Sequence, residues 1–198
     1  MSELPDKVRA FVSINIDRPI LKELRTFQQT LEDGVPKDSI RWSSPEQLHL
    51  TLKFLGNVAA SALTEVQDAL AQIIEPRRVL HLSAEGLGGF PNLRNPRVVW
   101  VGVKGDVEPL LQLQAQIEKV TAPWSQKEEN RAFHPHLTLG RVREKAFRHT
   151  RRIGEFLQGV EQPEFGRWRV LEIHLMRSQL SPKGSTYTVL ADLPLRGN

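Results

Sequence analysis

Two short phrases of the sequence carry the same polar residues at the same spacing. The tetrapeptide His-Leu-Thr-Leu occurs at residues 49–52 and again at residues 136–139, a separation of 87 positions (136 minus 49). Side chains on a β-strand alternate between two faces, so the histidine and threonine of each copy share one face and the leucines share the other. We therefore expect each phrase to bury its leucines and to present its histidine and threonine outward.

The two histidines are suited to acid–base chemistry at phosphorus. If two related halves of the chain face each other, His49 and His136 converge on one bound group. In-line displacement at phosphorus needs proton-transfer groups on opposite sides, and the ordinary histidine pKa of about 6.5 keeps both protonation states accessible near neutral pH. Thr51 and Thr138 would then bind the non-bridging phosphate oxygens. We predict that His49 is the general acid and His136 the general base.

Residues that follow the motifs supply further candidates. By strand alternation Lys53 shares the face of His49, and either Lys53 or Arg141 could offset negative charge that develops on the phosphate. Phe54 and Arg141 each lie five residues after a motif histidine. A nucleobase could therefore stack between their ring and guanidinium. The alternative for Phe54 is a core position, because alternation puts it on the leucine face.

A metal site is the competing interpretation of the histidines. His134 and His136 share one face of an extended segment, and together with His49 they could form a three-histidine zinc site. No acidic or cysteine ligand accompanies the motifs, and a metal would leave the duplicated threonines without a role. We therefore expect no metal and no other cofactor.

The composition indicates a soluble globular protein. The chain has 198 residues with 39% hydrophobic residues, enough for a substantial core, and its apolar runs are too short to span a membrane. The N-terminus does not read as a secretory leader. The absence of cysteine excludes disulfides and thiolate nucleophiles and fits a reducing compartment. We expect a cytoplasmic monomer with no membrane partner.

Positive charge is concentrated in one segment. The net charge is only +4, but residues 141–152, "RVREKAFRHTRR", hold six basic residues and one acid. Such a segment favours a polyanion such as RNA, because neutralised phosphates release counterions. The alternative is an ordinary solvated surface.

The expected secondary structure is a set of strands with helices between pairs of them. Apolar residues recur at helical spacing in four segments, and the first of these follows a potential cap at Asp17. The pattern predicts helices at 18–34, 61–74, 107–120 and 150–158. Alternation predicts strands at 9–17, 39–43, 48–56, 78–85, 97–103, 133–142, 167–178 and 185–193. Glycine and proline predict a loop at 86–96 and a turn at 181–184. This order indicates an α+β fold with mostly antiparallel sheet, in one domain spanning 1–198.

The surrounding sequence resembles a known family. The segments "RAFVSINID", "RWSSPEQLHLTLKFLGNV", "GLGGFPNLRNPRVVWVGV", "FHPHLTLGRV" and "SQLSPKGSTYTVL" are similar, in this order, to the RNA 2′,3′-cyclic phosphodiesterases, or 2′-5′ RNA ligases, of the two-histidine (2H) phosphoesterase superfamily. The resemblance implies two pseudo-symmetric lobes around a concave cleft, each contributing one motif. It implies hydrolysis of RNA 2′,3′-cyclic phosphate ends to 2′-phosphates and reversible, ATP-independent joining of tRNA halves. It also implies catalysis by His49 and His136 and phosphate binding by Thr51 and Thr138.

Two other functions remain open from the sequence alone. One is a non-catalytic RNA or nucleotide-binding module, although permanently charged arginines would serve binding better than histidines. The other is a cyclic phosphodiesterase that acts on a small nucleotide such as ADP-ribose 1″,2″-cyclic phosphate. The remaining histidines are expected to be structural or surface groups, and the tryptophans to be core residues: His81, His149, His174, Trp42, Trp100, Trp124 and Trp168.

Overall fold

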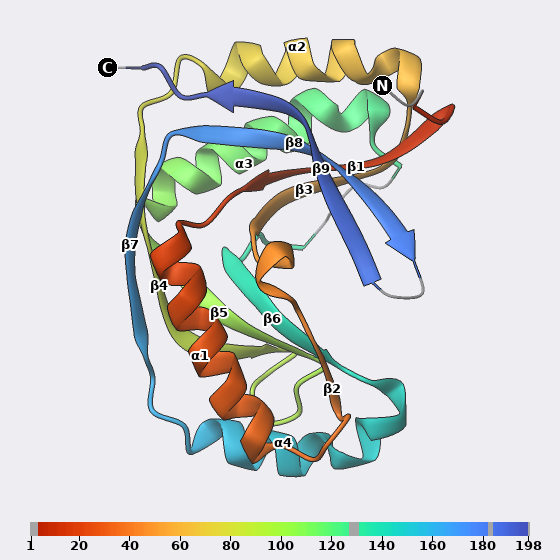
Figure 1. Ribbon diagram of the computed structural model, residues 1–198. Helices are drawn as coiled ribbons and strands as arrows, with labels where there is room; N and C mark the ends of the chain where they lie inside the picture. The colour runs from red at the N-terminus through yellow and green to blue at the C-terminus, as the bar shows by residue number, and fades with distance from the viewer. Residues whose placement is uncertain (1–3, 127–130, 182–183, 198) are drawn as a thin grey trace.

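In the computed structural model, which describes residues 4–126, 131–181 and 184–197, one antiparallel sheet organises the chain (Figure 1). The described residues form nine strands in the order β7-β4-β5-β6-β3-β1-β8-β9, with β2 paired to β6. The strands are β1 (Lys7–Ile14), β2 (Ile40–Trp42), β3 (Leu50–Ala59), β4 (Leu80–Phe90), β5 (Val98–Gly105), β6 (His136–Val142), β7 (Glu164–Val170), β8 (Glu172–Ser181) and β9 (Gly184–Pro194). The predicted α+β class is confirmed.

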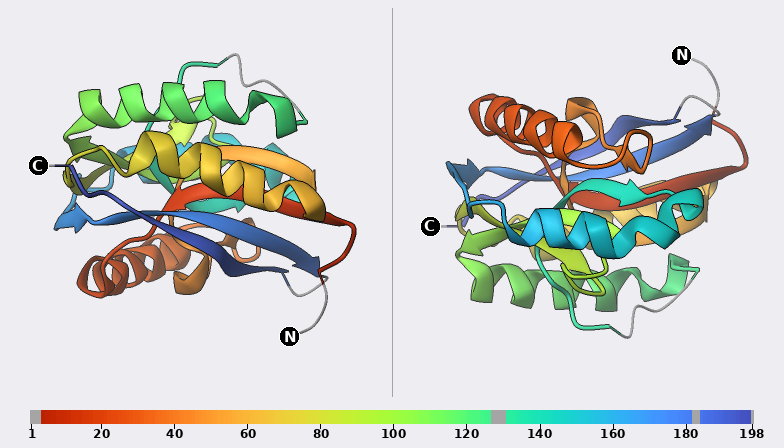
Figure 2. Two further views of the ribbon diagram at one scale, coloured as in Figure 1. Left: turned by 90° about the horizontal axis from the view of Figure 1, so that it is seen from above. Right: turned by 90° about the horizontal axis from the view of Figure 1, so that it is seen from below.

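The sheet consists of two halves that share one narrow contact. We call β3-β1-β8-β9 the His49 half-sheet, and β6-β5-β4-β7 with β2 the His136 half-sheet. The two are joined between β3 and β6, where a single pair of residues is in register. Figure 2 shows the helices lying outside the two half-sheets. Each half-sheet therefore has one face under helices and one face turned toward the other half.

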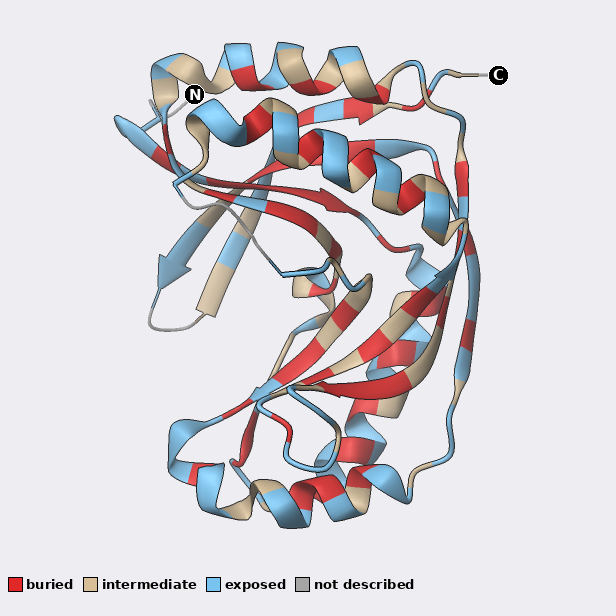
Figure 3. Ribbon diagram, turned by 180° about the vertical axis from the view of Figure 1, so that it is seen from behind, coloured by how far each residue is buried: buried red, intermediate tan, exposed pale blue. Residues whose placement is uncertain are grey.

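Four α-helices of the described ranges cover the outer faces. They are α1 (Arg18–Gly34), α2 (Leu63–Ile74), α3 (Val107–Thr121) and α4 (Thr150–Gln158), close to the predicted ranges. Helices α2 and α3 lie over the His49 half-sheet, and α1 and α4 lie beside the His136 half-sheet (Figure 1). Figure 3 shows buried residues on the sides of these helices that face the strands. None of the helices in the described ranges is long and apolar enough to cross a membrane.

Helix α1 illustrates how the sequence pattern packs a helix against the sheet. Ile20, Leu24 and Leu31 recur at helical spacing and are fully or almost fully buried. Asp17 occupies the N-cap position as predicted, but its side chain makes no capping hydrogen bond. Between the leucines, the buried Gln28 donates a hydrogen bond of 2.9 Å to the backbone oxygen of Leu139 on β6. The helix therefore holds β6 through a polar contact as well as through apolar packing.

The predicted loop at 86–96 is partly wrong. Strand β4 continues through Phe90, so the glycine-rich part of this segment is strand. The reason is packing: a Cβ atom on Gly88 would lie 2.1 Å from the ring of Trp100 on β5. The glycine makes room for an indole ring that lies across β4, and only the residues after Phe90 form the loop.

The predicted strand at 167–178 is two strands. Strand β7 pairs with β4 and β8 pairs with β1, so the two belong to different half-sheets. The chain crosses between them at Leu171, which is 55% exposed. Because apolar residues continue through this crossing, the sequence pattern gives no sign of it. The predicted pairing of the last two strands is confirmed by β8 and β9. The expected turn between them includes positions 182 and 183, which lie outside the described residues.

Candidate active site

The contact between β3 and β6 brings the two repeated phrases together. Leu50 pairs with Leu137 in antiparallel register, and both leucines are completely buried. Each leucine has the motif histidine before it and the motif threonine after it. Alternation turns these neighbours to the opposite face from the leucines, and the antiparallel direction sets each histidine diagonal to the other. A single backbone pair is therefore flanked by two histidines and two threonines, all partly exposed.

Backbone hydrogen bonds orient both imidazole rings. The Nδ1 atom of His136 lies 2.6 Å from the carbonyl oxygen of His134, two residues earlier. A carbonyl oxygen only accepts, so Nδ1 carries a proton and Nε2 remains available for chemistry. His49 is likewise hydrogen-bonded to the backbone of Gln47, also two residues earlier. The two motifs thus repeat the positioning of the ring as well as the residue types.

Aromatic rings surround His49 within its own half-sheet. The ring of Phe11, on β1, lies 4.9 Å from the imidazole. The ring of Tyr187, on β9, meets the imidazole edge to face at 5.2 Å and an angle of 89°. Phe11 and Tyr187 also contact each other at 5.1 Å. These rings limit the orientations of His49 and remove water from around it.

His136 has a matching pair of rings from the other half-sheet. Phe90, at the end of β4, meets the imidazole edge to face at 4.9 Å and 86°. Trp100, on β5, lies 5.9 Å away, and it is directly opposite Thr138 in the β5–β6 register. Each histidine therefore has one edge-to-face ring and one tilted ring. In the His49 half-sheet the edge-to-face ring carries a hydroxyl, and in the His136 half-sheet it does not.

Both histidines are biased toward the neutral form. Burial lowers the pKa of His49 to about 4, and the hydrogen bond to the Gln47 backbone only partly opposes this. Burial also lowers the pKa of His136, the His134 backbone opposes it, and the positive charge of Arg141 adds to the lowering. Two histidines with shifted pKa values on one face of a sheet are typical of a catalytic site.

Arg141 connects the two half-sheets electrostatically. Burial lowers the pKa of Arg141, Arg41 lowers it further, and Tyr187 raises it. Arg41 lies directly opposite Arg141 in the β2–β6 register, whereas Tyr187 belongs to the His49 half-sheet. Arg141 is therefore close to both His136 and Tyr187, and it keeps its charge at any physiological pH.

A β-bulge changes the predicted faces of Lys53 and Phe54. The register with β1 skips Leu52 and Leu55, so the alternation along β3 is interrupted twice. Lys53 is 4% exposed and forms an ion pair with Glu118 of α3, so its predicted place beside His49 is wrong. Phe54 is 57% exposed, and its ring lies 5.8 Å from that of Phe11. The core alternative for Phe54 is therefore wrong as well.

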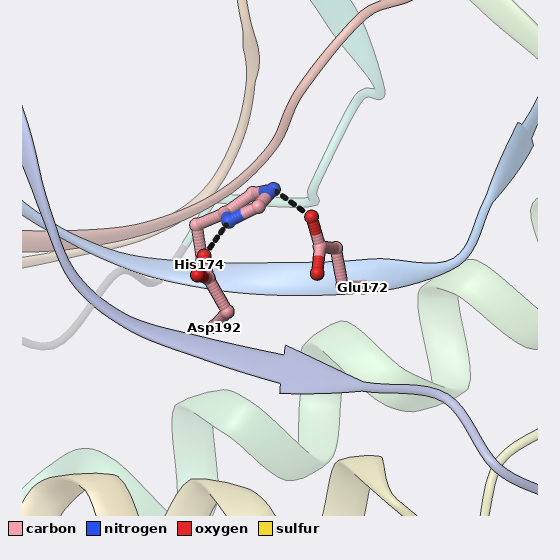
Figure 4. Close-up of side chains that lie close together, drawn as sticks. All are labelled: Glu172, His174 and Asp192. Atoms are coloured by element: carbon pink, nitrogen blue, oxygen red, sulfur yellow. Dashed lines mark hydrogen bonds and ion pairs between the residues drawn. The ribbon is translucent and has the colours of Figure 1, made fainter.

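The three-histidine metal site does not form among residues 4–126, 131–181 and 184–197. In that part of the chain, the group of three potential metal ligands that contains a histidine is Glu172, His174 and Asp192. It does not include His49, His134 or His136. Figure 4 shows the two carboxylates at different ring nitrogens. Nδ1 lies 2.8 Å from an oxygen of Asp192, and Nε2 lies 3.8 Å from an oxygen of Glu172. Both nitrogens are thus paired with carboxylates, and His174 as a whole is 3% exposed. The predicted structural role of His174 fits this arrangement.

Several residues of the site were not singled out from the sequence. Phe11 lies on the face of β1 opposite the predicted core residues. A large aromatic residue on that face was the sequence signal that could have identified it. Tyr187 is the only tyrosine of the chain, but nothing in its strand pattern places it beside a motif 138 positions earlier (187 minus 49). Phe90 fell within the predicted loop, and Trp100 was predicted as core. These contacts depend on strand order, which periodicity does not determine.

The fold and the site together define a phosphoesterase of the two-histidine class. The class follows from an antiparallel α+β sheet in which two His-x-Thr strands meet at its centre. The chain belongs to the LigT-like phosphoesterase family, which matches residues 14–100 and 101–187. The two matches begin 87 residues apart (101 minus 14), the same separation as the two motifs. The family repeat and the repeated phrases therefore describe one duplication.

Curated relatives and solved structures agree with this assignment. A Methanothermobacter thermautotrophicus protein named RNA 2′,3′-cyclic phosphodiesterase is 34% identical over 92% of this chain and 96% of its own length. A Thermus thermophilus protein of the same name is 35% identical over 77% of this chain and 74% of its own length. The crystal structure of Escherichia coli LigT complexed with 3′-AMP superposes with a TM-score of 0.74 at 26% identity, covering 96% of this chain and 98% of that one.

Proposed function

We propose that this chain hydrolyses the 2′,3′-cyclic phosphate at the end of an RNA and leaves a 2′-phosphate. The proposal depends above all on the Leu50–Leu137 pair, which is flanked by a histidine and a threonine from each strand. The relatives named RNA 2′,3′-cyclic phosphodiesterase support the substrate class. The lowered histidine pKa values support proton transfer as the role of the site.

In this proposal the two histidines work on opposite sides of the phosphorus atom. His136 accepts a proton from water as the water oxygen bonds to phosphorus. The bond from phosphorus to the 3′-oxygen breaks, and His49 donates a proton to that oxygen. The neutral form of His136 suits the base. For His49, the negative charge of bound phosphate raises the pKa and favours the protonated form that the acid needs.

The remaining polar groups bind the substrate. The hydroxyls of Thr51 and Thr138 donate hydrogen bonds to the two non-bridging oxygens, one from each half-sheet. The terminal nucleobase stacks on the exposed ring of Phe54, and the guanidinium of Arg141 contacts a phosphate group of the substrate. The 57% exposure of Phe54 supports the stacking contact, and the chain of rings from Phe54 through Phe11 to His49 sets it beside the acid.

The same arrangement supports RNA joining. When the 5′-hydroxyl of a second RNA replaces water, attack on phosphorus with loss of the 3′-oxygen forms a 2′-5′ bond, and no ATP is needed. We propose tRNA halves as substrates of this reaction and the cytoplasm as its location. The absence of cysteine supports a reducing compartment, and the basic segment 141–152 supports an RNA partner. We propose that the chain acts as a monomer, since one chain supplies both motifs.

One assay tests the proposed function. An oligonucleotide that ends in a 2′,3′-cyclic phosphate is incubated with the protein in a chelator, and the phosphate isomer of the product is identified. We expect a 2′-phosphate at an undiminished rate. A 3′-phosphate would reverse the leaving group, and loss of activity in chelator would contradict metal-independent catalysis. In parallel, ADP-ribose 1″,2″-cyclic phosphate tests the small-nucleotide alternative, which faster turnover of that compound would favour.

A further inference from the structure

Two arginines lie directly opposite each other beside the candidate active site. Arg41 on β2 pairs with Arg141 on β6, and both are exposed. Cross-strand partners share a face of the sheet, so the two guanidinium groups emerge side by side. Arg141 lies near His136, because its charge adds to the effect of burial in lowering the histidine pKa. The pair therefore borders the site that holds the reacting phosphate in the proposed function.

Like charges at directly opposed positions destabilise a sheet unless an anion lies between them. Within residues 4–126, 131–181 and 184–197, no carboxylate forms an ion pair with Arg41 or Arg141. Two neighbouring guanidinium groups offer paired N–H donors whose planar geometry matches phosphate oxygens. The arrangement is therefore suited to a phosphate group from outside the protein.

The position of the pair indicates which phosphate it binds. Arg141 lies five residues beyond His136 on β6, and Arg41 lies opposite it on β2, so the pair flanks the histidines on one side instead of lying between them. A nucleoside that presents its 2′,3′-phosphate to the histidines has its 5′-phosphate on the far side of the sugar. Resting on the proposed function, we propose that Arg41 and Arg141 bind the 5′-phosphate of the terminal nucleotide, the group that links it to the rest of the RNA.

The chain beyond β6 extends the same positive edge. Exposed basic side chains follow directly in the next turns, and the guanidinium of Arg97 lies 5.1 Å above the ring of Phe147 in this segment. The exposed basic residues are Arg143, Lys145, Arg148, Arg151 and Arg152. Of these, Arg151 is paired with Glu155 at 3.0 Å, which reduces its contribution. An RNA that leaves the site past Arg41 would meet this edge next.

Binding of two products that differ only in the 5′-phosphate tests the subsite without turnover. Calorimetry compares adenosine 2′-phosphate with adenosine 2′,5′-bisphosphate. We expect the bisphosphate to bind more tightly and Arg41→Gln to reduce this advantage about tenfold, as loss of a charged hydrogen bond predicts. Arg167→Gln, an exposed arginine in β7 at the far end of the sheet, should keep the original ratio. Equal ratios in Arg41→Gln and the unmodified protein would overturn the proposal.

Steady-state kinetics distinguishes a failure of the 5′-phosphate subsite from a failure of the proposed function. Three substrates are compared: adenosine 2′,3′-cyclic phosphate, the same compound with a 5′-phosphate, and the dinucleotide ending in the cyclic phosphate. We expect kcat/KM to be higher for the two substrates with a 5′-phosphate, and Arg41→Gln to reduce this preference mainly through KM. Hydrolysis of all three with no preference contradicts the subsite and leaves the function intact. Failure to hydrolyse any of them contradicts the function, and the binding ratio then still decides the subsite.

Discussion

The surroundings of His49 and His136 are alike in geometry and different in charge. Each ring is tied to a backbone group two residues earlier, and each has one edge-to-face and one tilted aromatic neighbour. Beside His136, however, lie the guanidinium of Arg141 and the imidazole of His134, which both act on its pKa. His49 has no such charge among the causes of its lowered pKa, and burial dominates. Duplication thus preserved the positions of the rings while the neighbouring charges diverged.

This difference suits two similar half-sheets to a reaction in which one histidine donates a proton and the other accepts one. Hydrolysis needs one proton donor and one acceptor, so two identical environments would be no advantage. Tyr187 makes the environments differ further, because its hydroxyl belongs to the ring that packs on His49, whereas the ring that packs on His136 is Phe90. The comparison predicts that matched substitutions in the two half-sheets have similar effects on rate and different effects on pH dependence.

The largest expected effects come from the histidines themselves. His49→Ala and His136→Ala should each reduce kcat/KM on an RNA 2′,3′-cyclic phosphate end by roughly 10²- to 10⁴-fold, because each removes a proton-transfer group. The double variant should be little slower than the worse single variant, since the two groups act in one step. Steady-state kinetics across pH provides the test. Identical pH profiles in the two variants would show that the histidines do not have distinct roles.

The threonines should have the next largest effects. Valine keeps the β-branched shape of threonine and removes its hydroxyl, so Thr51→Val and Thr138→Val should each lower kcat/KM by about ten- to a hundredfold. The two losses should be similar, because each threonine flanks the same Leu50–Leu137 pair. A loss confined to one variant would show that the phosphate is bound by one half-sheet only. Circular dichroism controls for folding.

Tyr187 gives a smaller and more specific test of the comparison. Tyr187→Phe makes the aromatic neighbours of His49 resemble those of His136 and should lower kcat/KM less than about tenfold, as expected for loss of one hydroxyl. Tyr187→Ala and Phe90→Ala remove whole rings and should be worse than Tyr187→Phe. If Tyr187→Phe and Tyr187→Ala are equally impaired, the hydroxyl and not the packing is the important feature.

Much of this site was predictable from sequence because both motifs are local. Strand alternation correctly separated His49 and Thr51 from the leucines. The repeat predicted that His136 and Thr138 would converge on them from a facing half of the chain, and in the structure the two motif strands adjoin at the Leu50–Leu137 pair. The same rule failed at Lys53 and Phe54, because a β-bulge depends on the partner strand β1 and has no sequence signal in β3.

The rest of the fold depended on long-range packing. The strand assignment of Gly88 required the ring of Trp100, and the break at Leu171 required two consecutive strands to join different half-sheets. Tyr187 reaches His49 because β9 also contacts the segment just before β3, where Gln47 Nε2 donates a hydrogen bond of 2.7 Å to the backbone oxygen of Ser185. Periodicity describes which face of an element is buried, and it does not describe which elements are neighbours.

A separate prediction concerns stability. The pKa of His49 is about 4 in the folded protein and about 6.5 in an unfolded chain, so the unfolded state binds the extra proton between these values. The free energy of unfolding should therefore fall as pH decreases from 6.5 to 4, with a contribution from His49 of up to about 3 kcal/mol. Urea unfolding at several pH values measures this, and His49→Gln should flatten the dependence. An unchanged slope in His49→Gln would contradict the lowered pKa.

In the proposed mechanism, the imidazoles of His49 and His136 face one phosphorus atom from opposite sides. A crystal structure of the protein with a dinucleotide that ends in a 2′-phosphate tests it most directly. We predict that a nitrogen of His136 lies within hydrogen-bond distance of an oxygen of the terminal phosphate, and that a nitrogen of His49 lies within hydrogen-bond distance of the adjacent 3′-oxygen. Both rings on the same side of the phosphate, or either ring at a distance from these oxygens, would contradict it.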